Sequence, residues 1–202
     1  MDVFSSDLAA FAEKVVSGLK RDPITTYHGR TFKRSMVGMC SQFVRMCTEG
    51  VQDLPDQSLG GVLFGGNARE TEALLLRAGK HTEDPARGDI VCFNRNTGAN
   101  GHIGIYLGDG IFAENTSSKS RGPGTVISRM SDMTGRVTGY YRVLPRPKLV
   151  GLIVLVENGP IVACRPTLEG DRVRCNLREL AEGLGYEVKP DLANHRVLLK
   201  RR

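Results

Sequence analysis

The chain has 202 residues, of which 40% are hydrophobic and 25% charged, a composition that excludes a disordered protein and favours a globular one. Its five cysteines are an odd number and too sparse for a disulfide scaffold, which favours synthesis in a reducing compartment. The formal net charge of +6 gives a surface that attracts polyanions, but 6% aromatic residues without Trp argue against nucleic acid as the partner.

The first predicted element is an amphipathic helix near the N-terminus. Asp7 is a candidate N-cap, and the helix is expected to end before Pro23. Its apolar positions share one face: Leu8, Phe11, Ala12, Val15 and Leu19. The segment lacks the continuous apolar core of a secretory signal, and no run elsewhere reaches transmembrane length, so we expect a packing helix and no membrane span.

A second helix is predicted to begin at Cys40. Gly38 breaks the preceding segment, Phe43 and Val44 follow at helical spacing, and Gly50 is the expected stop. A thiol in the first turn of a helix forms a thiolate more readily, because unpaired N–H groups and aligned peptide dipoles stabilise the negative charge. Cys40 is therefore a candidate nucleophile.

Three strands are predicted in the middle of the chain. Residues 89–93 form a short apolar run typical of a buried strand, and residues 103–107 and 111–115 form a hairpin around the turn at 108–110. His102 comes directly before the first strand of this hairpin. It therefore lies at the mouth of the strand pair.

His102 and the polar pair Glu114 and Asn115 complete a candidate catalytic set with Cys40. An imidazole forms an ion pair with a thiolate and later protonates the leaving amine, while a third polar group fixes the orientation of the ring. A change of one residue in the hairpin register would exchange Glu114 for Asn115, so either residue is a candidate for this third role. The ordered set points to a cysteine hydrolase.

The remaining cysteines and histidines have structural interpretations. Cys47 and Cys92 lie in apolar runs and are predicted to be core residues, and His28, His81 and His195 to be surface residues. No close Cys or His pair has zinc-ligand spacing, so neither a metal nor a cofactor is expected.

Two central motifs resemble those of a known family. Residues 40–44 (CSQFV) are similar to the nucleophile helix of NlpC-type papain-like cysteine peptidases, and residues 85–93 (PARGDIVCF) with 101–110 (GHIGIYLGDG) are similar to their second half. These enzymes are related to the cysteine-histidine-dependent amidohydrolases and generally cut amide bonds in the peptide stems of the bacterial cell wall. The resemblance implies a papain-like α+β domain over residues 1–146, with peptidoglycan as its partner.

By position, the resemblance implies that Cys40 is the nucleophile, His102 the base and Glu114 the third residue. Tyr27 resembles the upstream tyrosine that lies near the oxyanion site in this family, and Ser41 is a second candidate for contacts with the substrate or the oxyanion. The backbone N–H of Cys40 is the expected main donor to the oxyanion.

The chain also departs from the family pattern. Met39 and Gln42 stand where Asp and Gly are common, and Glu114 stands where His, Asn or Gln is usual. Three functions remain open: a wall endopeptidase or amidase, such as a phage-type lysin; a toxin or amidase acting on a non-wall substrate; and an inactive wall-binding or structural protein. Without a recognisable signal, we expect synthesis in a bacterial or phage-infected cytoplasm and action at the wall or after another route of secretion.

A second, smaller α/β domain is predicted over residues 150–202, after a stiff connector at 144–148. The pattern predicts strands at 150–156, 161–164, 172–175 and 197–199, and a helix at 177–184. This segment resembles the N-terminal stalk domain of copper amine oxidases, which is accessory in bacterial wall proteins and implies neither copper nor catalysis. Wall attachment, packing and dimerisation all remain open for it, and the oligomeric state is not predicted.

Overall fold

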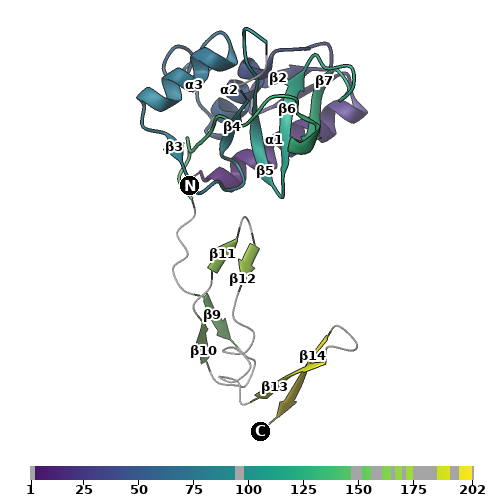
Figure 1. The fold of residues 1–202 in the computed structure, drawn as a ribbon, viewed down its shortest axis with the longest axis vertical. Helices are drawn as coiled ribbons and strands as arrows, with labels where there is room; N and C mark the ends of the chain where they lie inside the picture. Colours follow the sequence, from purple (N-terminus) through teal and green to yellow (C-terminus); the bar gives the residue numbers. More distant parts are fainter. Residues whose placement is uncertain are drawn as a thin grey trace. The chain divides into compact units, whose positions relative to one another are not determined.

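The structure is a computed structural model that describes residues 3–93 and 98–146 in full, and the backbone of six strands between residues 152 and 201 (Figure 1). The chain divides into two compact units, Met1–Pro147 and Lys148–Arg202. Within the described residues, no helix has both the length and the apolar character needed to cross a membrane.

The first unit contains a six-stranded antiparallel sheet in the order β3-β8-β4-β5-β6-β7. These strands are β3 (His81–Thr82), β4 (Ile90–Cys92), β5 (Ile103–Gly108), β6 (Ile111–Thr116), β7 (Gly124–Arg129) and β8 (Gly139–Tyr141). The helices are α1 (Ser5–Arg21), α2 (Cys40–Val51), α3 (Ala68–Arg77) and the 3₁₀ turn η1 (Met130–Asp132), and a separate hairpin comprises β1 (Ile24–Tyr27) and β2 (Arg30–Lys33). This mixture confirms the predicted α+β class.

The main core lies between one face of the sheet and helices α1 and α2. Because side chains alternate along a strand, Ile103 and Ile105 of β5 point into this core, and Ala113 of β6 joins them. The opposite face carries a smaller cluster that includes Val91 and Phe112. The predicted hairpin of β5 and β6 is confirmed, and its turn has positive φ angles at Asp109 and Gly110.

Helix α1 buries the predicted apolar face, since Leu8, Phe11, Ala12, Val15 and Leu19 are all buried. The predicted cap is wrong by three residues: Phe4 is the N-cap, and Asp7 lies in the first turn. There, its Oδ2 accepts a 2.8 Å hydrogen bond from the Phe4 N–H. A carboxylate there satisfies an N–H at the helix start and also interacts favourably with the helix dipole.

Helix α2 begins at Cys40 as predicted, but the expected stop at Gly50 is wrong, because the helix continues to Val51. Gly50 has a packing role: a Cβ at this position would lie 2.9 Å from Cζ of Phe11 on α1. The glycine therefore permits the two helices to approach closely. Gly50 therefore contributes through its small size and not through an unusual backbone conformation.

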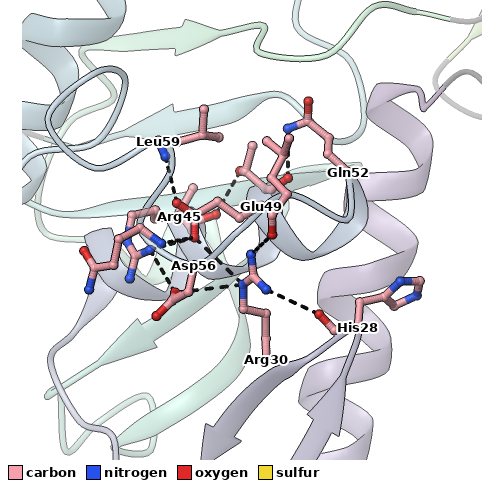
Figure 2. A network of polar contacts seen from close by, with 11 residues as sticks. His28, Arg30, Arg45, Glu49, Gln52, Asp56 and Leu59 are labelled. Carbon is pink, nitrogen blue, oxygen red and sulfur yellow. Dashed lines mark hydrogen bonds and ion pairs between the residues drawn. The ribbon is translucent and has the colours of Figure 1, made fainter.

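A buried ion-pair network fixes the segment that follows α2 (Figure 2). Glu49 is fully buried and accepts hydrogen bonds from Arg45 Nη1 at 2.6 Å and from the backbone N–H of Leu59 at 2.9 Å. Arg30, on β2, places Nε 3.9 Å from the same carboxylate and also donates to the carbonyl of Leu54. One carboxylate thus joins the helix, the β1–β2 hairpin and the loop after the helix.

The turn that leads into β4 fits closely against the start of α1. Gly88 has φ +87°, and a Cβ there would lie 1.6 Å from the carbonyl oxygen of Ser5, so this backbone conformation and this space both require glycine. Asp89 is buried and binds Arg142 Nη2 at 2.9 Å and the N–H of Ala86 at 2.8 Å. These contacts fix the position of β4 within the sheet.

The second unit contains three antiparallel strand pairs among its described residues. These are β9 (Leu152–Leu155) with β10 (Ile161–Cys164), β11 (Thr167–Glu169) with β12 (Arg172–Arg174), and β13 (Tyr186–Asp191) with β14 (Arg196–Arg201). Each of the four strands predicted here overlaps one of these strands, whereas β11 and β13 were not predicted. The helix predicted at 177–184 lies outside the described residues, and the stalk-domain resemblance stays a prediction.

Candidate active site

A groove with a volume of about 540 Å³ lies at the N-terminal end of α2. Cys40 and His102 line it, together with Gly66 and Ser117 from the two glycine- and serine-rich loops at 60–66 and 116–124. A volume of this size is within the usual range for small-ligand sites. The groove therefore offers room for a short stretch of peptide beside the thiol.

Cys40 is half-buried in the first turn of α2. Phe43 donates its N–H to the carbonyl of Met39 at 2.9 Å, so the N–H groups of the preceding helical residues have no partner from the helix itself. By contrast, Cys47 and Cys92 are fully buried, and burial raises the pKa of both thiols well above the ordinary value. The prediction that these two are core residues is confirmed.

His102 contacts both Cys40 and Glu114. Its Nε2 lies 2.5 Å from Oε2 of Glu114, and the ring also hydrogen-bonds to the Cys40 side chain. Because Nε2 faces Glu114, Nδ1 is the nitrogen available to the thiol. The strand register explains the geometry: Glu114 pairs with Gly104, two residues beyond His102, so both side chains project from the same face.

The surroundings of His102 favour its charged form. Burial lowers the pKa of this imidazole, but hydrogen bonds to Cys40 and Glu114, together with the charges of those groups, outweigh burial and raise the pKa to about 9. The side chain is only 12% exposed, so water screens these interactions weakly. These contacts favour an imidazolium between the Cys40 side chain and the Glu114 carboxylate.

Glu114 is fully buried, yet its environment favours the carboxylate. Burial raises the pKa of Glu114, but the contacts with His102, Ser128 and Arg121 outweigh it and lower the pKa below the ordinary value. Arg121 places Nε 2.9 Å from Oε1 and Nη2 3.4 Å from Oε2. No sequence pattern indicated this arginine, because it belongs to an irregular loop.

Asn115 projects from the opposite face of β6 and does not take the place of Glu114 beside the imidazole. Its Oδ1 accepts a 2.7 Å hydrogen bond from the Met39 N–H, and its Nδ2 donates at 2.9 Å to both the Met36 carbonyl and Thr125 Oγ1. Asn115 thus ties the segment before Cys40 to the sheet.

Of the two residues predicted to contact the substrate or the oxyanion, Ser41 lines the groove and Tyr27 does not. Tyr27 lies against α1, where Lys14 Nζ is 4.7 Å from the centre of its ring, and it is not among the described residues that line the groove. Ser41 lines the groove, but its buried hydroxyl donates to the Gly65 carbonyl at 2.9 Å and contacts Thr71 Oγ1 at 2.7 Å. Ser41 therefore anchors the 60–66 loop.

Among the residues that the structure describes, no group of three or more His, Cys, Asp or Glu side chains is arranged to hold a metal ion. The groove brings together a thiol, an imidazole and a carboxylate, the groups that cysteine hydrolases use.

Comparison with known families supports this class. The model of the NlpC/P60 family matches residues 39–134, the segment that contains Cys40, His102 and Glu114. This segment, slightly under half of the chain, is similar to the NlpC/P60 family, which comprises cysteine peptidases and amidases. The match supports the NlpC part of the resemblance seen in the sequence. No curated protein matches the chain.

Two solved structures from Trichomonas vaginalis are among those similar to this chain. NlpC2 has 18% sequence identity and a TM-score of 0.44, over 70% of this chain and 48% of its own. NlpC1 has 19% identity and a TM-score of 0.40, over 65% of this chain and 43% of its own. The chain thus spans about half the length of these relatives.

Proposed function

We propose that the protein is a cysteine peptidase or amidase that cleaves amide bonds in the peptide stems of peptidoglycan. The observation that carries the proposal is the contact of His102 with both Cys40 and Glu114 at a groove in the segment that matches the NlpC/P60 family. Peptide stems are the general substrate class of this family, and the surface charge of +6 suits an anionic wall.

In the first chemical step, the Cys40 thiolate attacks the carbonyl carbon of the scissile amide. The backbone N–H of Cys40, at the start of α2, donates to the oxygen as it becomes negative. The C–N bond then breaks, and the His102 imidazolium gives its proton to the departing amine. This step leaves a thioester on Cys40 and a neutral imidazole.

In the second step, water attacks the thioester carbon while neutral His102 accepts a proton from it. The C–S bond breaks, the acid is released, and the thiolate and imidazolium form again. Glu114 holds the ring through Nε2 in both steps and stabilises its charged form.

The substrate is tested by incubating purified peptidoglycan with the wild type, with Cys40→Ala and with Cys47→Ala, and identifying released fragments by mass spectrometry. We expect fragments from the wild type and from Cys47→Ala, and at least a 1000-fold loss of rate with Cys40→Ala, on the order of the effect of removing a catalytic nucleophile. The mass of the fragments distinguishes an endopeptidase from an amidase.

A non-wall amide is the second candidate substrate, and one observation favours it. Met39 is 46% exposed on the groove beside Cys40, where related enzymes commonly carry Asp, so this part of the groove offers an apolar surface in place of a carboxylate. A thiol that alkylates rapidly without any wall cleavage would favour a toxin or a small-molecule amidase. An unreactive thiol in a protein that sediments with wall would favour an inactive binding protein.

The place of action and the role of the second unit are part of the same proposal. We propose that the protein is made in a bacterial or phage-infected cytoplasm, as a lysin would be, and acts at the wall. Residues 150–202 serve as an accessory module there, for attachment or for self-association.

A further inference from the structure

Glu114 is an unusual group to place beside a base that must give up a proton during turnover. The carboxylate is fully buried, and its Oε2 lies 2.5 Å from Nε2 of His102. A buried negative charge at this distance stabilises the imidazolium strongly. The second chemical step, however, needs neutral imidazole to activate water. A carboxylate without a counter-charge would therefore slow hydrolysis of the thioester.

Arg121 supplies this counter-charge from the far side of the carboxylate. Its guanidinium contacts both oxygens of Glu114, with Nε 2.9 Å from Oε1 and Nη2 3.4 Å from Oε2, and Nη2 also donates to Thr116 Oγ1 at 3.0 Å. The arginine side chain is 14% exposed and lines the groove. A two-point contact of this kind fixes the plane of the carboxylate as well as neutralising it.

We propose that Arg121 is a positioning residue of the catalytic set: it fixes the Glu114 carboxylate toward His102 and balances its charge, so that His102 can both hold and release a proton. The inference rests on the proposed roles of Cys40, His102 and Glu114. It explains how this chain uses a carboxylate at a position where related enzymes commonly use a neutral or weakly basic side chain.

The direction in which the His102 pKa changes when Arg121 is removed follows from charge alone. Removing a cation beside Glu114 raises the proton affinity of the coupled Glu114–His102 pair, whichever of the two groups carries the proton. The pKa of His102, already raised to about 9, would therefore move further up. The charged and titratable groups that face the pair are Cys40, Arg121 and the Ser128 hydroxyl, with Arg129 and Asp132 along the adjoining hollow.

The test is a pH titration of ¹³C-labelled histidine by NMR, with the resonance of His102 assigned by its loss in His102→Gln. In Arg121→Gln we expect the titration midpoint of His102 to rise by about one pH unit. Arg121→Lys keeps the charge but contacts only one oxygen, so a smaller rise is expected. Arg129→Gln removes the same charge from an exposed neighbour on β7 and should leave the midpoint unchanged.

An unchanged or lowered midpoint in Arg121→Gln would overturn the proposal, as would an equal rise in Arg129→Gln. Unshifted His28 and His81 resonances establish that the variant is folded. If Arg121→Gln does not fold, Arg121→Lys provides the test. A small rise of the His102 titration midpoint in that variant supports the proposal, and an unchanged midpoint overturns it. In a Glu114→Gln background, the effect of Arg121→Gln should shrink, because the arginine acts through Glu114.

These titrations need no substrate, so they separate the two proposals. If the midpoints move as expected but no wall fragment is released, the substrate assignment fails and the role of Arg121 stands. If wall is cleaved, and the alkaline limb of the pH–rate profile, where His102 loses its proton, is the same in the wild type and Arg121→Gln, the role of Arg121 fails and the substrate assignment stands.

Discussion

The candidate site combines Cys40, His102 and Glu114, which lie on or directly beside regular elements, with Arg121, which contacts Glu114 from a loop. Cys40 and His102 were predicted because a helix start and a strand start each leave a local pattern. The choice between Glu114 and Asn115 depended on the hairpin register, which pairs Gly104 with Glu114 and so directs Glu114 toward the imidazole. Arg121 reaches Glu114 from an irregular loop, and no periodicity encodes that contact.

The raised pKa of His102 has a consequence for stability. In the unfolded chain this group has its ordinary pKa of 6.5, and in the fold it titrates at about 9, so the native state binds the proton more tightly. The stabilisation is fully present below pH 6.5 and is lost as the pH rises through 9. Its upper limit is about 3 kcal/mol, since each tenfold change in proton affinity corresponds to about 1.4 kcal/mol.

Urea unfolding at pH 6, 8 and 10 checks this expectation in the wild type and His102→Gln. We expect the wild type to be the more stable protein by up to about 3 kcal/mol at pH 6, with a difference that shrinks toward pH 10. In Cys40→Ala the pH dependence should be flatter, because one of the two partners of the imidazolium is gone. A difference that stays constant with pH would contradict the account.

At the scale of elements, strong apolar patterns were predictable and short or irregular elements were not. The β5–β6 hairpin and helices α1 and α2 follow periodic apolar residues, whereas β7 and β8 have no such pattern. Helix α3 was not predicted, although Asn67 three residues before Glu70 is a capping signal that the structure uses: Asn67 Oδ1 accepts the Glu70 N–H at 3.0 Å. That signal was available in the sequence.

The buried network of α2 gives a prediction about stability. Glu49→Ala leaves the guanidinium groups of Arg45 and Arg30 without their buried anion, so we expect the free energy of unfolding to fall by about 3–5 kcal/mol. Asp56→Asn is the matched control, since the Asp56 side chain is 63% exposed and its contact with Arg45 should contribute about 1 kcal/mol or less. Equal losses in urea unfolding would show that the network does not depend on Glu49.

At the scale of the whole molecule, the sequence predicted where the chain divides into two units. It did not establish what the second unit does. A proline-rich connector indicated a boundary near residue 146, and the chain divides at Pro147 and Lys148. Every described residue of the candidate site belongs to the first unit. The role of the second unit stays a prediction, because its sequence motif consists of residues that build a fold and not a site.

The most direct test of the account is the alkylation rate of Cys40 by iodoacetamide at pH 6, followed by peptide mass mapping in the wild type and His102→Gln. Because the site holds an imidazolium against the thiol, we expect wild-type Cys40 to react at least 10-fold faster than the variant, on the order of the difference between an ion-paired thiolate and an ordinary thiol. The fully buried Cys47 and Cys92 should react far more slowly and serve as internal controls. Equal rates for Cys40 in the two proteins would contradict the assignment of Cys40 and His102 as a catalytic pair.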